Sequence, residues 1–259
     1  MSLVYLYAVT PPAAAGWLQA NDVRGIGGQR VRAIGVAKVV GAVSDVPESE
    51  FDQEPLDRNV ADSAWLAPHA AAHQDVNASL LDGIGAVLPL AFGTIFRGEE
   101  GVRRVLGERE DELAVALSAV TGRVEWVCTL DRDLKIAAAY RARSRASAAV
   151  AGTGEGRSYL LRRKAEVESI EEQRALDREA REELRDALAA VADEVTDEPL
   201  IEGGPAARFT VLLRRDAEDG LRRAAMRYAA RWSERGYEPR LGGPWPPYRY
   251  GARVSALRE

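Results

Sequence analysis

Two histidines, His69 and His73, are the residues of this sequence whose type and spacing come nearest to a metal site. They stand four positions apart, so on a helix both imidazoles would face the same side and could bind zinc. The zinc-peptidase pattern needs a glutamate directly after the first histidine, but Ala70 follows His69, and no third ligand can be assigned. Surface or helix-packing histidines are the favoured interpretation, and we expect no metal and no other cofactor.

Three glycines, Gly152, Gly154 and Gly156, precede a predicted helix, as the glycines of a phosphate-binding loop do. A P-loop follows a strand and ends in Lys-Ser or Lys-Thr, and this segment has neither feature. Glycine-rich segments are also common between domains. The sequence therefore favours a linker here.

The sequence contains no combination of residues typical of a catalytic site. The Gly-x-Ser-x-Gly pattern of hydrolases is absent, and Cys128, the only cysteine, has no assignable base and cannot form an internal disulfide. The acidic run Glu48, Glu50, Asp52 and Glu54 is predicted to be a solvated loop. We therefore predict that the protein is not an enzyme.

Composition excludes further classes of protein. The net charge of −5 argues against nucleic acid as a partner, because binding to phosphates needs an excess of basic groups. The hydrophobic content of 46% is sufficient for a buried core. No window reaches the roughly 18 consecutive apolar residues of a membrane span, and the N-terminus lacks the features of a signal peptide. We expect a cytoplasmic protein that does not bind lipid membranes.

The apolar segment Val87–Phe96 is predicted to be a kinked central strand around which the N-terminal part is built. It carries no charge, as expected of a strand covered on both faces, while Pro89 and Gly93 allow a bend. The other predicted N-terminal elements are a strand at Leu3–Val9, a hairpin over residues 31–42 that turns near 35–38, a loop over 44–57, a helix over 59–81 interrupted by Pro68, a helix from about Glu99 to Gly122, and a closing strand at 123–130. The helix from Glu99 has a predicted apolar stripe, and the closing strand alternates so that its apolar residues share one side: Val102, Leu106, Leu113, Leu117 and Val120 in the helix, and Val124, Trp126 and Cys128 in the strand.

This order of elements predicts an α+β fold with two domains. The N-terminal domain, residues 1–135, would be a ferredoxin-like sheet with helices on one face. After a linker at 136–157, a smaller α+β domain at 158–241, a variant of the ferredoxin-like fold, would begin with a long helix over 158–195 and continue with a strand at 208–213, a helix capped by Asp216 and ended by Gly236, and a short strand at 237–241. Each of its two helices has a predicted apolar stripe: Leu176, Ala180, Leu184, Leu188 and Val191 in the first, and Leu221, Ala225, Tyr228 and Trp232 in the second.

The segment 242–259 is predicted to be an extended tail rich in proline and aromatic residues. Its candidate partner-binding residues are Trp245, Pro246, Pro247, Tyr248 and Tyr250. Two interpretations stay open, because aromatic residues serve both purposes: the tail is a partner-binding strip, or it folds back and seals an apolar groove on its own domain.

Five motifs in a fixed order resemble the GvpF/GvpL family of gas vesicle proteins. They cover nearly the whole chain: the strand at 3–9, Trp65 and His73 ahead of VLPLAFGTIF, GRVEWVCTLDRD at 122–133, GRSYLLRRK at 156–164, and GPWPPYRY at 243–250. The VLPLAFGTIF core and the GPWPPYRY segment together are specific to this family.

The resemblance implies a non-enzymatic accessory protein of gas vesicle formation. Such a protein would bind the major shell protein GvpA and other gas vesicle accessory proteins, help to nucleate or assemble the vesicle, and move from the cytoplasm to the gas vesicle. A rival hypothesis is a ferredoxin-like enzyme or ligand-binding protein that encloses a haem or small organic molecule, using His69 or His73. A third is a regulatory module whose melting temperature rises with its ligand.

Overall fold

The computed structural model describes residues 3–148, 158–201 and 203–254, which form two compact units. Unit 1 comprises the described residues up to Glu125 together with those from Pro244 onward, and unit 2 is Trp126–Gly243. The chain therefore divides after 125 and 243 instead of at the expected 135 and 241. The glycine triad at 152–156 lies outside the described residues.

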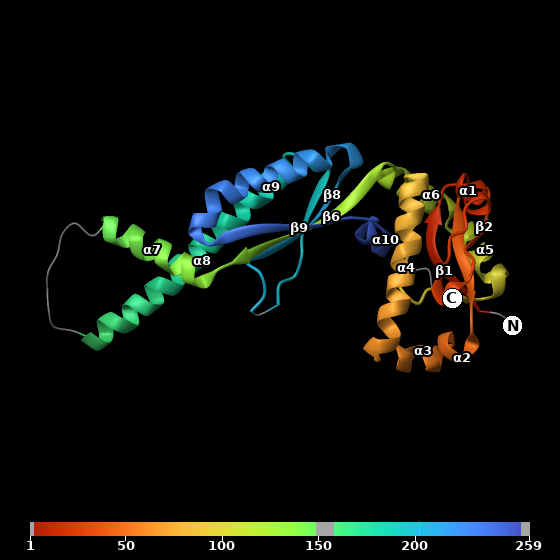
Figure 1. Ribbon diagram of the computed structural model, residues 1–259, viewed down its shortest axis with the longest axis horizontal. Helices are drawn as coiled ribbons and strands as arrows, with labels where there is room; N and C mark the ends of the chain where they lie inside the picture. The colour runs from red at the N-terminus through yellow and green to blue at the C-terminus, as the bar shows by residue number, and fades with distance from the viewer. Residues whose placement is uncertain (1–2, 149–157, 202, 255–259) are drawn as a thin grey trace. The chain divides into compact units, whose positions relative to one another are not determined.

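The sheet of unit 1 is antiparallel, with the strand order β2-β3-β1-β4 and with β5 also paired to β1 (Figure 1). The strand at 3–9 and the hairpin are thereby confirmed. The strands are β1 (Leu3–Thr10), β2 (Arg32–Gly35), β3 (Val40–Val46), β4 (Leu88–Pro89) and β5 (Ile95–Arg97).

Strand β1 is the centre of this sheet, and the prediction that Val87–Phe96 is a single central strand is wrong. That segment forms β4 and β5, which pair successively with the same edge of β1. Between them the chain turns through Gly93, whose φ of 83° a residue with a Cβ rarely adopts. All eight residues of β1 are buried. The absence of charge in Val87–Phe96 indicates that the segment is buried. It does not tell a central strand from edge strands, because a covered edge strand is equally apolar.

Helices cover both faces of this sheet, and the expectation of helices on one face is wrong. Val4 and Leu6 belong to the apolar cluster that includes α5 and α6, whereas the Tyr5 hydroxyl contacts α4 on the opposite face. A strand such as LVYLYAV has no polar side for water, so both of its faces need a cover. The helices are α1 (Ala14–Ala20), α4 (Ser63–Ile84), α5 (Gly98–Glu108) and α6 (Glu110–Val120).

Three regions of unit 1 differ from their predicted secondary structure. The expected loop at 44–57 contains two short helices, α2 (Glu48–Phe51) and α3 (Gln53–Asn59), because Phe51 is buried and the Asp52 side chain accepts a hydrogen bond from the Gln53 N–H. Pro68 lies within α4, in its first two turns. The helix predicted from Glu99 breaks at Arg109 into α5 and α6, although its predicted apolar stripe is buried as expected.

The sheet of unit 2 has the order β7-β8-β6-β9. Strand β6, predicted to close the first sheet, instead lies in the middle of the second, with Val124, Trp126 and Cys128 buried on one side as expected. The strand β7 was not predicted. The strands are β6 (Arg123–Arg132), β7 (Glu194–Asp197), β8 (Ala207–Arg214) and β9 (Tyr237–Trp245).

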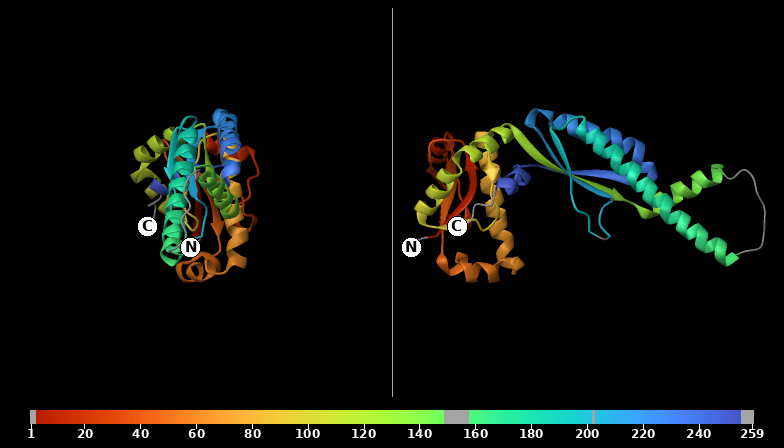
Figure 2. Two further views of the ribbon diagram at one scale, coloured as in Figure 1. Left: turned by 90° about the vertical axis from the view of Figure 1, so that its left-hand side faces the viewer. Right: turned by 180° about the vertical axis from the view of Figure 1, so that it is seen from behind.

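Helices α8 (Ser158–Ala189) and α9 (Glu218–Trp232) lie side by side on one face of this sheet (Figure 2). They bury the predicted stripes except for Val191, which lies beyond α8 and is half-buried. The Tyr228 hydroxyl donates a hydrogen bond to the Ala180 carbonyl at 2.9 Å. Asp216 does not cap α9, because it lies in a 3-10 turn and pairs with Arg214. The expected linker at 136–157 is in part a helix, α7 (Leu134–Ala148). Among the described residues, every helix is too short or too polar to span a bilayer.

Candidate functional site

From Pro244 onward the described C-terminal residues belong to unit 1, and they end in a helix instead of an extended tail. After β9 ends at Trp245, the chain passes through Pro246 and Pro247, both buried, and forms helix α10 (Tyr248–Val254). Trp245 is 37% exposed, whereas Tyr248 and Tyr250 are half-buried. Of the five candidate partner-binding residues, Trp245 is therefore the one that is exposed.

Helix α10 covers β4, the edge strand of the unit 1 sheet. It contacts β4 and α6, and Gly251 lies so close to β4 that a Cβ at this position would stand 1.9 Å from the Pro89 carbonyl oxygen. The Arg249 N–H donates a hydrogen bond to Glu125 Oε2 at 3.0 Å. An uncovered edge strand exposes unpaired backbone groups to other chains, so α10 protects this edge.

The two tyrosines of α10 reach opposite faces of the sheet. Tyr250 packs against the apolar cluster that contains Val4 and Leu6. The Tyr248 ring lies 6.4 Å from the His73 ring, between centroids, on the face that carries Tyr5. Burial raises the pKa of Tyr248 to about 12, so its hydroxyl stays protonated at neutral pH. The segment thus packs against both faces of the sheet at this edge.

His73 is the polar centre of an aromatic cluster between α4 and β1. Its Nδ1 lies 3.0 Å from the Tyr5 hydroxyl, which accepts a hydrogen bond from the Gly93 N–H, and its Nε2 lies 3.1 Å from Asn77 Nδ2. Burial lowers the pKa of His73 to about 4 and raises that of Tyr5. Both groups are therefore neutral near pH 7. The cluster links α4 to β1 through the hydrogen bonds and ring contacts of a buried, uncharged imidazole. The rings around His73 are Tyr5, Tyr7, Phe92 and Tyr248.

His69 has other partners, although it shares helix α4 with His73. Its ring stacks on Trp65 with centroids 4.1 Å apart, and the Trp65 indole N–H donates a hydrogen bond to Glu50 Oε2 at 2.8 Å. Within the described residues, no three His, Cys, Asp or Glu side chains form a group that could hold a metal ion. The structure thus places the two histidines in separate packing roles.

Cys128 and a surface hollow are the remaining candidates for chemistry, and both lie in unit 2. Burial raises the pKa of the Cys128 thiol to about 12, which makes it unreactive at neutral pH. The hollow has a volume of about 790 Å³ between α7 and the start of β9 and is open to solvent. It is lined by Ile136, Tyr140, Arg143, Ser144, Ser233, Glu234 and Glu238. This lining contains neither of the histidines that a haem would use.

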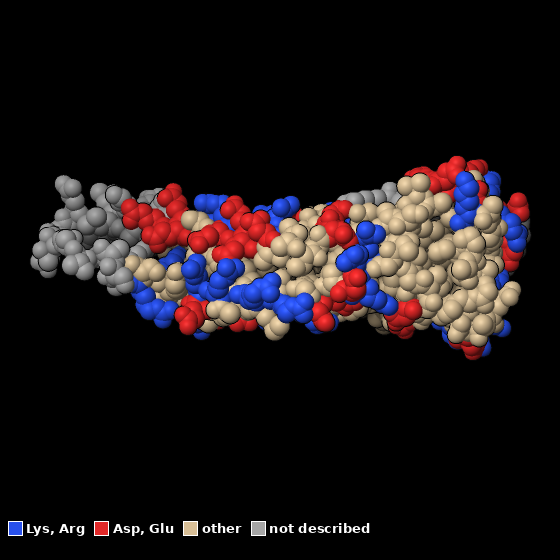
Figure 3. All heavy atoms as spheres, turned by 90° about the horizontal axis from the view of Figure 1, so that it is seen from above, with Lys and Arg blue, Asp and Glu red and all other residues tan. Residues whose placement is uncertain are grey.

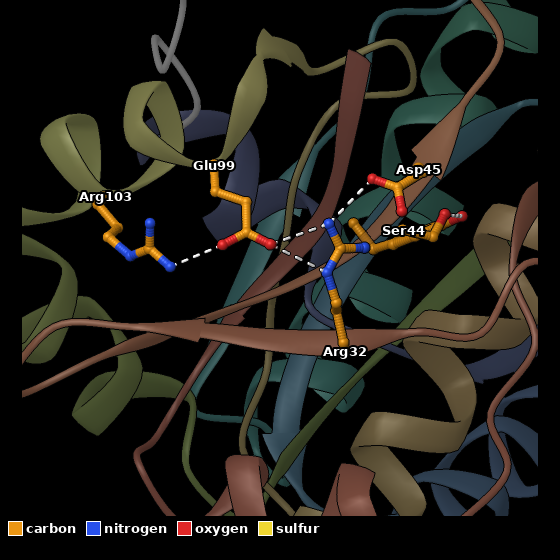
Figure 4. A network of polar contacts seen from close by, with 6 residues as sticks. Arg32, Ser44, Asp45, Glu99 and Arg103 are labelled. Atoms are coloured by element: carbon orange, nitrogen blue, oxygen red, sulfur yellow. Dashed lines mark hydrogen bonds and ion pairs between the residues drawn. The ribbon is translucent and has the colours of Figure 1, made fainter. Parts of the chain in front are cut away.

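A network of charged residues joins α5 to the β2–β3 hairpin (Figure 4). Arg32 contacts Glu99 Oε1 at 3.1 Å and Asp45 Oδ1 at 2.9 Å, and Arg103 contacts Glu99 Oε2 at 2.6 Å. Arg32 lowers the pKa of Glu99, which stands in the first turn of α5, where a negative charge is favourable. The spacing of Glu99 and Arg103 predicts their contact, but nothing in the sequence reveals that Arg32 joins them.

The described residues thus define a mixed helix and sheet protein with two antiparallel sheets, in which the polar clusters named above support the fold. Comparison with known proteins identifies its family. The profile of the family described as "Gas vesicle synthesis protein GvpL/GvpF" matches residues 3–250, so this chain belongs to the GvpL/GvpF family.

Two curated relatives and one solved structure illustrate the similarity. Gas vesicle protein F of Streptomyces sp. (strain CB03234) is 31% identical over 86% of this chain and 88% of that protein. Gas vesicle protein L of the same strain is 36% identical over 62% of this chain, and the match spans 58% of that relative's length. The crystal structure of GvpF from Anabaena sp. PCC7120 shares the fold, with a TM-score of 0.70, 18% identity, and coverage of 97% of this chain and 96% of that one.

Proposed function

We propose that this chain is a non-enzymatic accessory protein of gas vesicle formation that binds the major shell protein GvpA and other gas vesicle accessory proteins. It would act in the cytoplasm, help to nucleate or assemble the shell, and become part of the gas vesicle. The observation that carries this proposal is the match of the GvpL/GvpF family to residues 3–250, which includes both units and the C-terminal segment.

The proposed partner-binding residues are Trp245, Pro246, Pro247, Tyr248 and Tyr250. Trp245 supplies the exposed aromatic ring, and the other four residues, which follow it in the chain, are buried or half-buried. Tryptophan is enriched among the residues that dominate binding energy at protein interfaces. A rigidly presented ring also binds with a smaller loss of conformational entropy than a ring on a mobile tail.

A topological argument supports a ferredoxin-like fold for each unit. Both units run strand, helix, strand, strand, helix, strand, if the additional short elements are set aside. In both, the four main strands lie in the order second, third, first, fourth. This is the split strand-helix-strand arrangement of ferredoxin-like domains. We therefore propose two ferredoxin-like units in one chain.

Co-purification of the full-length chain with GvpA tests the proposed function. We expect GvpA to be retained, and Trp245→Ala to weaken retention by about tenfold, as for an aromatic anchor. Ile201→Ala is the matched control, because Ile201 is an exposed apolar residue of unit 2 that lies outside the segment. No interaction with GvpA, together with intact vesicles after gene deletion, would contradict the function. Retention unchanged in Trp245→Ala would contradict only the site.

A further inference from the structure

From Arg222 to Arg231, every charged residue on the outer face of α9 in unit 2 is basic, whereas exposed Asp219 lies in the first turn of the helix. Its exposed positions repeat along one side of the helix, and no acidic residue occurs between Gly220 and Ser233. Met226, 62% exposed, gives this face an apolar component. The exposed residues of the face are Arg222, Arg223, Met226, Arg227, Ala230 and Arg231.

The neighbouring face of α8 is acidic. Glu179, Glu182 and Asp186 are exposed at the helical spacing i, i+3 and i+7, so they lie in one stripe. Two arginines of α8, Arg181 and Arg185, bind Asp197 of β7. Figure 3 shows the result over unit 2 as a band of acidic atoms along α8 beside a band of basic atoms along α9.

Part of this charge is satisfied within the chain. Arg231 pairs with Glu183, and Arg235 contacts Glu179 at 3.3 Å, so the two helices are tied together along their seam. In the part of the chain that the structure describes, Arg223 and Arg227 on α9 and Glu182 and Asp186 on α8 make no ion pair. All four of these side chains are exposed and therefore accessible to another molecule.

Because the acidic and basic bands lie side by side, they restrict the charge distribution that a partner can have. Packed helices lie about 8–10 Å apart, which is within the Debye length of about 10 Å at moderate ionic strength. A partner of one sign, such as a nucleic acid or a uniformly acidic protein, would be attracted by α9 and repelled by α8. The face therefore fits a surface that itself carries one acidic and one basic band.

We propose that the α8–α9 face is a self-association surface for a second copy of this chain. A twofold axis parallel to the helices places α8 of one copy over α9 of the other, so acidic and basic bands face each other twice. Such self-complementary contacts are typical of twofold dimers. Met226 of each copy would then be covered, and the flexible thioether can adapt to the helix it meets.

Charge reversal on the full-length chain tests this dimer. We would measure the mass in solution by sedimentation at low and high ionic strength, where the wild type should be a dimer that weakens as salt rises. The variant Arg223→Glu with Arg227→Glu gives the combined face a net negative charge, and Glu182→Arg with Asp186→Arg gives it a net positive charge. Each variant alone should dimerise at least about tenfold more weakly, because like charges then face each other.

An equimolar mixture of the two variants should restore the dimer, which misfolded variants could not do. Arg58→Glu with Arg208→Glu is the matched control, because it changes the net charge equally at exposed sites outside the face. It should leave the dimer intact. A monomeric wild type at low salt, a dimer unaffected by either reversal, no rescue in the mixture, or a monomeric wild type that binds an RNA probe through Arg223 and Arg227 would each overturn the proposal.

Discussion

The two units build the same kind of sheet but cover it differently. In unit 1, helices lie on both faces, and every residue of the central strand β1 is buried. In unit 2, α8 and α9 cover one face, and the central strand β6 alternates between buried and half-exposed residues from Trp126 to Asp131. Half-exposed Val127 and Thr129 lie on the face opposite to these helices.

This difference shows what each cover demands of its strand. A strand covered on one face needs apolar side chains on that face alone, and β6 alternates accordingly. A strand covered on both faces must also satisfy any polar atom that it buries. Strand β1 does so by pairing the Tyr7 hydroxyl with Ser44 at 2.8 Å and the Tyr5 hydroxyl with His73.

Acidification should destabilise unit 1 through His73. The pKa of His73 is about 4 in the folded protein and 6.5 for an ordinary histidine, the value taken for the unfolded chain. Between pH 4 and 6.5, His73 is therefore protonated in the unfolded chain but not in the folded protein. The free energy of unfolding should therefore fall as pH drops from 6.5 to 4, by up to about 3 kcal/mol. Urea unfolding across this pH range measures the slope. His73→Gln should flatten it, and His69→Gln, which removes an imidazole elsewhere on α4, should leave the His73 contribution in place.

Removing a valine should cost more from the covered strand than from the half-covered one. Val4 on β1 is fully buried in the apolar cluster, whereas Val127 on β6 is half-exposed. We expect Val4→Ala to lower the stability of unit 1 by about 2–3 kcal/mol and Val127→Ala to lower that of unit 2 by about 1 kcal/mol or less. Hydrogen exchange resolves the two units separately. Equal losses would refute the distinction between the two sheets.

Adding one methyl group at Gly251 should loosen the cover of the unit 1 edge. Its Cβ would stand 1.9 Å from the Pro89 carbonyl oxygen, so α10 must shift, at a cost of about 1–3 kcal/mol. Gly16→Ala in α1 is the control, because no atom lies within 4 Å of its added Cβ. It should stabilise the protein by up to about 1 kcal/mol. Amide exchange in α10 reports the loosening, and protection unchanged in Gly251→Ala would mean that α10 does not seat against β4.

Breaking an ion pair on the open face of unit 2 should have the smallest effect. Asp131 Oδ2 lies 2.6 Å from Arg240 Nε across β6 and β9, and both side chains are more than one third exposed. A double-mutant cycle with Asp131→Ala and Arg240→Ala should give a coupling below about 1 kcal/mol, which shrinks as salt rises. A larger, salt-independent coupling would show that this face is covered after all.

The sequence alone determined which side of an element is buried wherever apolar residues recur at the period of a helix or a strand. Alternation in RVEWVCTL predicted the buried side of β6, and helical stripes predicted the buried residues of α5, α6, α8 and α9. The ordered motifs also indicated the family. These predictions succeed because a periodic apolar pattern reports which side of an element leaves water.

Only the tertiary structure decided which partner each buried side meets. In the structure, β6 belongs to the second sheet, β4 and β5 pair with one edge of β1, and the C-terminal segment packs in unit 1 against Pro89. The structure also joins Arg32 to Glu99 and Tyr5 to His73 across 67 and 68 residues of sequence. An apolar or charged side chain has the same local pattern whichever partner it meets, so the choice depends on packing between segments that are distant in the chain.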